Sequence, residues 1–385
     1  MRKIKIAVAP ALAAGLLAAG AATAATAHAA PMSTRYVSPS GQSGARDASC
    51  HTAGYSSINA AIAASGRGGT VVVCAGTYRA EVIISKPLNL IGREGAVIDA
   101  AGQARLNVGG VLPGSIGIGV LATSDVRVSG FKVEDAGFDA ILVARSTDVS
   151  VSDNVLVHNG NVGVDINGSS FSQAVRNIAE DNAGGGFLVA DDLGRSSHNG
   201  VSHNVASRNP GGCGVILAGH GTAGVTDTLV ADNLLTYNGT MKSKEGAGVV
   251  IATEVRGGTV ADNTVTGNTI YGNGLAGVTI HAHMPGQDLN GNRITDNTIG
   301  VNNTLGDPVD LVGAKSSPKI AVVADTRTTG ILVGAASPIR VQILGNDIDS
   351  DHYGIFLEGV GKAVRASLQD NHYRHVAVRV SRVAS

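Results

Sequence analysis

Two short motifs, VSVSDN at residues 149–154 and GVDI at residues 163–166, decide the fold of this chain because they return along the sequence. The next copy reads AVRN at 174–177 and GFLV at 186–189, and nine residues separate the asparagine from the glycine in both copies. The same spacing is ten from Asn204 to Gly214, nine from Asn268 to Gly277 and eight from Asn346 to Gly354. Self-similarity at a nearly constant period is the mark of a repeat architecture.

The glycine that opens each apolar strand gives the length of the repeat. Successive glycines lie 23, 28, 34, 29, 53 and 24 residues apart, at Gly163, Gly186, Gly214, Gly248, Gly277, Gly330 and Gly354. A period of 23 to 29 residues accommodates three short β-strands and three turns, and it exceeds the period of hexapeptide solenoids. We therefore predict an all-β fold, a three-sided right-handed parallel β-helix, and interpret the step of 53 as two coils.

The repeated asparagine marks a turn, and we assign it to structure instead of to binding. Asparagine tolerates the left-handed backbone conformation that tight turns require. Its amide can also stack on the asparagine one coil further along.

The beginning of the chain has the composition of a secretory signal. Three basic residues lie within the first five positions, an apolar run follows at residues 6–25, and small residues flank Ala29. No later apolar run approaches the roughly 18 to 20 residues that a membrane span needs, so we expect a soluble, secreted protein without a membrane span. We predict three segments, a signal peptide at 1–29, an N-terminal cap at 30–75 and a β-helix at 76–385.

A short helix is expected in the cap. Ile58, Ala61 and Ile62 fall on one helical face, with Ser56 as the candidate N-cap and Gly66 as the stop. Such a helix would cover the apolar end of the first coil. Short β-branched segments that predict the first strands follow at residues 70–74, 82–84, 88–91 and 97–99.

The three cysteines predict one disulfide. Cys50 and Cys74 flank a short segment of a chain that we expect to be exported, whereas Cys213 lies in an apolar strand. We therefore expect a bridge between Cys50 and Cys74, and a buried thiol at Cys213.

Charge and aromatic content narrow the class of partner. The net charge is -1, with 29 Lys and Arg against 30 Asp and Glu, so no global field attracts nucleic acid or an anionic membrane. Aromatic residues make up 3% of the chain and tryptophan is absent, whereas neutral sugars are usually held by aromatic stacking. We expect a monomer whose partner is a polar or acidic polysaccharide.

The segment AGTY at residues 75–78, followed by VIISKPLNLIG at 82–92 and the Asn/Gly coils, resembles the pectin-lyase-like β-helix superfamily from Tyr36 onward. The opening segment is also similar to that of the β-helix accessory protein of nitrous oxide reductase maturation. This superfamily contains lyases, hydrolases, epimerases and adhesins. The resemblance therefore implies a fold, and the activity must be argued from a site.

One column of polar residues is the candidate site. The residues six places after the strand-opening glycines are Asp192, His220, Glu254 and His283 in consecutive coils. Because parallel strands lie about 4.8 Å apart, Asp192 and His220 should be neighbours, and Asp192 and Glu254 should lie about 9 to 10 Å apart. Four residues spread so widely cannot all bind one metal, and the sequence assigns no cofactor. A neighbouring histidine and carboxylate could still hold a divalent cation.

A second resemblance concerns the same column. Polygalacturonase-type glycosidases carry an Asp-Asp pair and a Gly-His-Gly on successive coils, and this chain has Asp191-Asp192 and then GHG at residues 219–221. The resemblance implies a further carboxylate at Asp165 and a basic residue at Arg256. The chain departs from that pattern because no Arg-Ile-Lys occurs and the pairs follow the strand. GFD at 137–139 and DHYG at 351–354 echo fragments of an alginate-epimerase motif, and we interpret them as coincidence.

We therefore predict a β-helix protein that binds, and cleaves or epimerises, an extracellular polysaccharide. In the hydrolytic version, one carboxylate donates a proton to the leaving oxygen, the other activates water, and His220 tunes both. A non-catalytic surface-interaction module and a metal-accessory protein remain the alternatives. The candidate catalytic residues are Asp191, Asp192, His220 and Glu254, and the candidate substrate-binding residues are His281, His283, Asp165 and Arg256.

Overall fold

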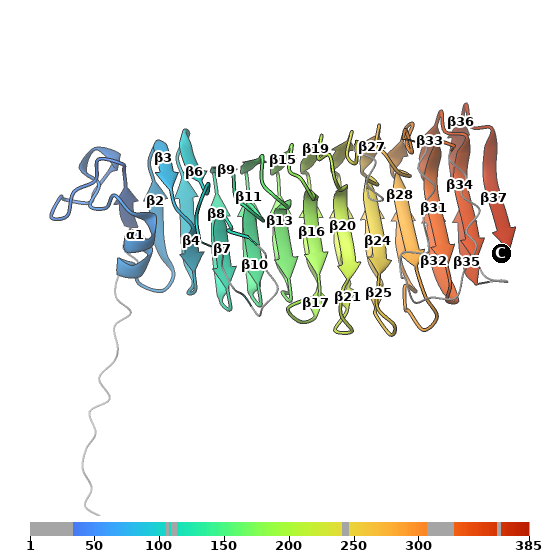
Figure 1. Cartoon of the computed structure of the whole chain (residues 1–385), viewed down its shortest axis with the longest axis horizontal. Helices are drawn as coiled ribbons and strands as arrows, with labels where there is room; N and C mark the ends of the chain where they lie inside the picture. Colours follow the sequence, from blue (N-terminus) through green and yellow to red (C-terminus); the bar gives the residue numbers. More distant parts are fainter. Residues whose placement is uncertain are drawn as a thin grey trace, which may run out of the picture. The chain divides into compact units, whose positions relative to one another are not determined.

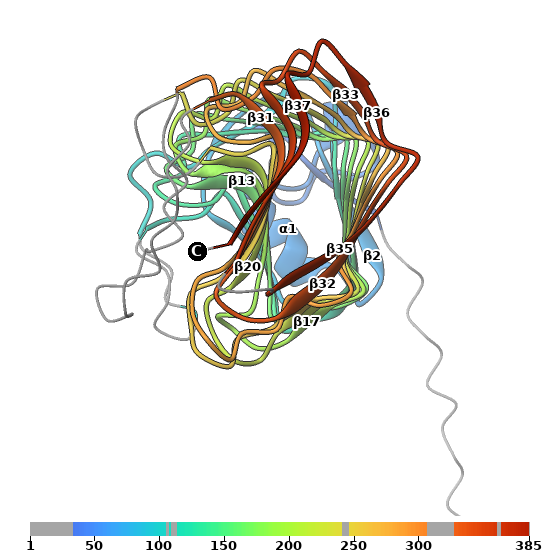
Figure 2. The same cartoon turned by 90° about the vertical axis from the view of Figure 1, so that its right-hand side faces the viewer.

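A computed structural model describes residues 34–104, 108, 114–240, 246–305, 327–359 and 363–384, and the predicted signal peptide at 1–29 lies outside them (Figure 1). The described strands form three long sheets, here called A, B and C, and a small fourth sheet, and every paired strand runs parallel to its neighbour. Viewed along the solenoid, the strands of each sheet stack on one side of a shared interior (Figure 2). The predicted three-sided parallel β-helix is therefore confirmed.

The strands of each sheet are as follows. Sheet A contains β1 (Thr34–Val37), β2 (Gly69–Val73), β5 (Leu88–Gly92), β8 (Ser124–Ser129), β11 (Thr147–Ser152), β14 (Gln173–Val175), β18 (Gly200–Ser202), β22 (Leu229–Ala231), β26 (Thr264–Thr266), β29 (Arg293–Thr295), β32 (Ile339–Leu344) and β35 (Val364–Gln369). Sheet B contains β3 (Gly76–Arg79), β6 (Ala96–Asp99), β9 (Lys132–Glu134), β12 (Val155–Val157), β15 (Ile178–Glu180), β19 (Val205–Ser207), β23 (Leu234–Thr236), β27 (Thr269–Tyr271), β30 (Thr298–Ile299), β33 (Asp347–Asp349) and β36 (His372–Arg374). Sheet C contains β4 (Val82–Ile84), β7 (Ile118–Leu121), β10 (Ile141–Ala144), β13 (Val162–Asn167), β16 (Gly185–Ala190), β20 (Cys213–Gly219), β24 (Val249–Thr253), β28 (Val278–Ala282), β31 (Thr329–Ala335), β34 (Tyr353–Gly359) and β37 (Val378–Ala384). The small sheet contains β17 (Ser196–Ser197), β21 (Val225–Thr226) and β25 (Val260–Ala261).

The interior is one continuous apolar core made of alternate strand residues. In sheet C, Val164 and Ile166 of β13 pair in register with Phe187 and Val189 of β16, and all four are buried in the same cluster. The period of two along each strand sends these residues inward and their neighbours outward. Each coil therefore buries its apolar residues against the coils on either side.

Two ladders of buried asparagines run along the turns, and they confirm the structural assignment made from the sequence. In each ladder the Nδ2 of one asparagine donates to the Oδ1 of the asparagine one coil further along, as from Asn204 to Asn233 at 3.0 Å. The first ladder comprises Asn154, Asn177, Asn204, Asn233, Asn268, Asn297, Asn346 and Asn371. The second comprises Asn159, Asn182, Asn209, Asn238, Asn273 and Asn302.

The strand-opening glycines are required because the coils approach closely there. A Cβ on Gly186 would lie 2.5 Å from the carbonyl oxygen of Gly214, and one on Gly277 would lie 2.7 Å from that of Gly330. Gly277 and Gly330 thus occupy adjacent coils, and β28 pairs directly with β31. The interpretation of the 53-residue step as two coils is therefore wrong. It is one coil with a long insertion, because an insertion in a turn leaves the strand register unchanged.

The start of the solenoid also differs in detail from the prediction. Helix α1 (Ile58–Ala64) buries Ile58, Ala61 and Ile62, as predicted, but its N-cap is Ser57, whose hydroxyl accepts the N–H of Ala60. Ser56 is therefore not the cap. A short 3₁₀ helix, η1 (Cys50–Thr52), precedes α1. Strands β1 and β2, within the segment predicted as a cap, are already members of sheet A.

The cysteines are arranged as expected. A disulfide joins Cys50 and Cys74, whose Cα atoms are 5.7 Å apart. Cys213 is buried in β20 and takes no part in that bridge. No helix among the described residues is long and apolar enough to cross a membrane.

Asp351 continues the second ladder in place of an asparagine, and this substitution generates a prediction. Its Oδ1 accepts the N–H of Asn302, its Oδ2 has no hydrogen-bond partner among the described residues, and burial raises its pKa to about 8. The neutral form is therefore favoured by folding, so the stability that Asp351 contributes is full below about pH 4 and is lost as the pH rises toward 8.

We expect Asp351→Asn to raise the free energy of unfolding at pH 7 by about 2 kcal/mol and to change it little at pH 4. Urea unfolding at the two pH values measures this difference. Asp370→Asn, at an exposed turn position, is the matched control and should change little at either pH. An Asp351→Asn protein that is no more stable at pH 7 would contradict a neutral buried carboxyl.

Candidate functional site

The predicted polar column forms at the corner where the strands of sheet C end. Ala190, Ala218, Ala252 and His281 are paired in register on β16, β20, β24 and β28. The residues two places further along each chain segment are Asp192, His220, Glu254 and His283. The alignment of these four residues, one per coil, is therefore as predicted.

Asp192 and His220 are in direct contact. The Nδ1 of His220 lies 3.0 Å from one carboxylate oxygen of Asp192 and 3.1 Å from the other. Their side chains remain 38% and 20% exposed, for His220 and Asp192 respectively, so both can reach a ligand in solvent. The contact makes an ion pair whenever the imidazole is protonated.

The contact shifts both pKa values. The hydrogen bond that His220 donates to Asp192 is the largest influence on His220, and with the charges of Asp192, Glu254 and Asp191 it outweighs desolvation and raises the pKa of the imidazole. Desolvation is the largest influence on Asp192, but the His220 contact and the Asn167 amide oppose it and together lower the pKa of that carboxyl. The pair is therefore held as carboxylate and imidazolium over a wider pH range than isolated groups would be.

Asn167 links this pair to a buried carboxyl. Its Nδ2 donates to Asp192 at 2.9 Å and to Asp165 at 3.4 Å, and its Oδ1 accepts the N–H of Leu193. Asp165 is 2% exposed, and desolvation together with the charges of Asp139 and Asp192 raises its pKa well above the ordinary range. The pKa values of the two carboxyls are therefore shifted in opposite directions, which favours the neutral form of Asp165 and the ionised form of Asp192.

Asp139 is a further carboxyl of this cluster that the sequence analysis missed. It is fully buried, Asn161 donates to it at 2.8 Å, and desolvation raises its pKa to about 7. The signal was GFD at 137–139, which we interpreted as coincidence. The strand register gives a clearer signal for Asp139. The equivalent positions in the next coils are Val162, Gly185 and Cys213, and none of these residues is charged.

Asp191 holds the loop that carries His220. It is 2% exposed, and its two carboxylate oxygens accept the N–H groups of Gly221 and Gly224, each at 2.8 Å. Because both oxygens are used inside the turn, Asp191 faces the backbone instead of the solvent. Asp191 is therefore a positioning residue for the loop that carries His220.

The other predicted residues lie further along the corner. Glu254 and Arg256 are exposed in the loop after β24, and Glu254 is close enough for its charge to act on His220. The rings of His281 and His283 meet edge to face with centroids 5.4 Å apart. His281 is buried, and desolvation followed by the charge of His283 lowers its pKa well below the ordinary value. The structure thus brings Asp165, Asp192 and His220 together, and it keeps His281 apart from them by two coils or more.

The arrangement can perform proton transfer. A carboxyl of raised pKa, a carboxyl of lowered pKa and an imidazole of raised pKa lie in one hydrogen-bonded line, and divergent pKa values are what general acid–base chemistry needs. Within the described ranges, no group of three or more His, Cys, Asp or Glu side chains is arranged to hold a metal ion. A shallow hollow of about 410 Å³ on the same side of the solenoid contains Arg145, which donates to the carbonyl of Leu193.

Comparison with known proteins gives a family match and several similar folds. The family profile described as "Right handed beta helix region" matches residues 117–371. No curated protein matches the sequence. The finer resemblance to a nitrous oxide reductase accessory protein finds no support in these results.

Three solved structures illustrate the likeness of fold. The A-module of a mannuronan C-5 epimerase from Azotobacter vinelandii has a TM-score of 0.57 and 18% identity, over 85% of this chain and 93% of that one. A pectate lyase has a TM-score of 0.53 and 16% identity, over 89% and 80% of the two chains. The catalytic domain of an α-1,3-glucanase has a TM-score of 0.51 and 14% identity, over 92% and 67%. Identities this low establish a common fold alone.

The contact between Asp192 and His220 can be tested in solution. We expect the pKa of His220 to lie above the ordinary histidine value and to fall in Asp192→Asn, because the substitution removes the carboxylate that stabilises the imidazolium. Histidine titration by NMR measures both values. Glu254→Gln, which removes a charge without a hydrogen bond, should lower the pKa by less. A His220 pKa that is the same with and without Asp192 would contradict the contact.

Proposed function

Since the chain belongs to the right-handed β-helix family of pectin-lyase-like proteins, we propose that it binds a polysaccharide at the corner bearing Asp192 and His220 and cleaves it there. The observation that carries the proposal is the hydrogen-bonded line from Asp165 through Asn167 and Asp192 to His220. Burial raises the pKa of Asp165 at the buried end of this line, and hydrogen bonds lower the pKa of Asp192 at its exposed end.

The geometry of a solenoid suits a polymer. The column places one functional side chain every coil, about 4.8 Å apart along the axis. A polysaccharide lying parallel to the axis would meet Asp192, His220, Glu254 and His283 in turn. The catalytic groups would then act on one glycosidic bond while neighbouring coils hold the adjoining sugars.

His220 is the better proton donor of the column. The lowered pKa of Asp192 leaves that carboxylate without a proton to donate at neutral pH, whereas the raised pKa of His220 favours the imidazolium, which has one. Asp192 therefore orients the ring through Nδ1 and leaves Nε2 to protonate the leaving glycosidic oxygen. Glu254, one coil further along, takes a proton from the water that attacks the anomeric carbon. The C–O bond to the leaving oxygen breaks as the water oxygen bonds to the anomeric carbon.

Two features of the chain support a location outside the cytoplasm. A disulfide persists in oxidising surroundings, and the Cys50–Cys74 bridge supports a site of action outside the cytoplasm. The signal-like segment at 1–29 supports export. We propose that the protein is secreted, works as a monomer and does not bind nucleic acid.

The proposal predicts a specific pattern of lost activity. His220→Asn, Asp192→Asn and Glu254→Gln should each lower kcat by about a hundredfold or more, with unchanged melting, because each removes a group that transfers or positions a proton. Product release from a panel of uronate-containing and neutral glycans measures kcat. Asp227→Asn, at an exposed turn of the same solenoid, should retain full activity.

The pH profile supplies a second readout of the same experiment. Because His220 must be protonated, kcat/KM should fall as the pH rises through the raised pKa of the imidazole. Binding without product, unaffected by substitution of Asp192 and His220, would instead favour a non-catalytic surface-interaction module. No product and no binding across the panel would overturn the proposal.

A further inference from the structure

The outer face of sheet A becomes more basic in its last three described coils. The outward residues of β29, β32 and β35 include three arginines and no carboxylate. In the coils from β8 to β26, Arg127 is the single cationic residue at the equivalent outward positions. The outward residues of the last three coils are Arg293, Thr295, Arg340, Gln342, Leu344, Arg365, Ser367 and Gln369.

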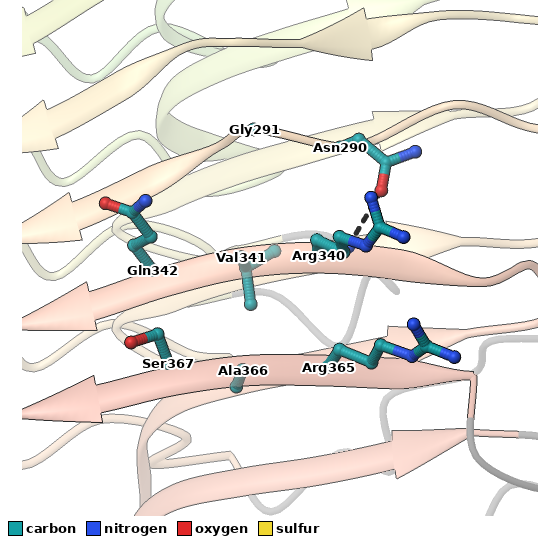
Figure 3. Close-up of a pocket in the computed structure, with 8 residues that line it drawn as sticks. All are labelled: Asn290, Gly291, Arg340, Val341, Gln342, Arg365, Ala366 and Ser367. Carbon is teal, nitrogen blue, oxygen red and sulfur yellow. Dashed lines mark hydrogen bonds between the residues drawn. The ribbon is translucent and has the colours of Figure 1, made fainter.

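A hollow of about 560 Å³ lies on this face, and Figure 3 shows the side chains around it. Arg340 and Arg365 extend side by side from adjacent strands, and Gln342 and Ser367 form the next outward pair. The backbone N–H of Arg340 is fixed by the side-chain oxygen of Asn290 at 2.8 Å. The hollow is thus open, cationic at one end and rich in neutral polar groups at the other.

The two arginines face each other without a counter-charge. Arg340 pairs in register with Arg365, so their side chains leave the sheet about 4.8 Å apart, and like charges in such a pair repel. Among the described residues, neither guanidinium forms an ion pair. Asp262, one coil before Gly291, is an acidic neighbour, and among the described residues it forms no ion pair with either arginine.

Three other exposed arginines of the solenoid are neutralised by the adjacent coil. Arg176 pairs with Asp153, Arg208 with Glu180 and Arg374 with Asp347, all across one coil step. The repeat can therefore place a carboxylate beside an arginine, and it does not do so at Arg340 and Arg365. An anionic ligand would remove the repulsion that the sheet leaves there.

We propose that this hollow, the Arg340/Arg365 site, binds the acidic groups of an anionic polysaccharide. Each guanidinium takes one carboxylate or sulfate by paired N–H donors, and Gln342 and Ser367 bind sugar hydroxyls. Neutral sugars and unstacked bases are disfavoured because no aromatic side chain lines the hollow. The site lies on sheet A and requires no catalysis at Asp192 on the edge of sheet C.

The experiment compares wild-type protein with Arg340→Gln/Arg365→Gln. Binding to polygalacturonate, to a sulfated glycan, to a neutral glucan and to a DNA oligonucleotide is measured by calorimetry at low and at physiological ionic strength. We expect wild type to bind one or both acidic glycans, the double variant to bind about tenfold more weakly or worse, and its salt dependence to be shallower. Which acidic glycan binds identifies carboxylate or sulfate as the ligand group.

Two controls separate this site from the catalytic proposal. Arg127→Gln removes an outward arginine of the same sheet and should leave affinity within about twofold of wild type. Product release by the Arg340→Gln/Arg365→Gln protein is measured in parallel and reports separately on the catalytic proposal. Equal binding by the double variant, absence of binding to either acidic glycan, or equal affinity for the neutral glucan or the DNA would overturn the proposal.

Discussion

Along the two turn ladders, the amide of each asparagine before the last donates to the asparagine one coil further along, and its own oxygen accepts from the coil before. A slip of one residue between two coils would break the ladder bonds at that junction and leave their amides buried without partners. The glycine column acts at the same time, because no Cβ fits where successive coils approach. Together they hold the strands in register over coils whose loops differ widely in length.

Constant register is what allows function to arise in variable loops. Asp192, His220 and Glu254 follow strands that align residue by residue. Asp192 and His220 therefore meet although 28 residues of chain separate them, and Glu254 follows one coil further along, 34 residues later. The same rule sets Arg340 beside Arg365 on another sheet. At the first location, burial and hydrogen bonding separate the pKa values of neighbouring groups. At the second, two like charges are left for a ligand to neutralise.

The periodic part of this molecule could be predicted from sequence, and the aperiodic part could not. The asparagine and glycine spacing predicted the solenoid, its ladders and the alignment of Asp192 with His220, because all of these depend on register alone. The inward direction of Asp191 was not predictable, since it depends on how the loop at Gly221 and Gly224 folds back. Asp139 was missed because residues from three coils form its environment. The 53-residue step was misinterpreted because a long insertion in a turn lengthens the step as an extra coil would.

The most direct test of the proposed polysaccharide site is a crystal structure of the Glu254→Gln protein with the acidic oligosaccharide that binds it best. We predict that the sugar chain runs along the corner of sheet C, with a glycosidic oxygen about 3 Å from the Nε2 of His220. Sugar density that leaves Asp192 and His220 in contact with solvent alone would contradict it.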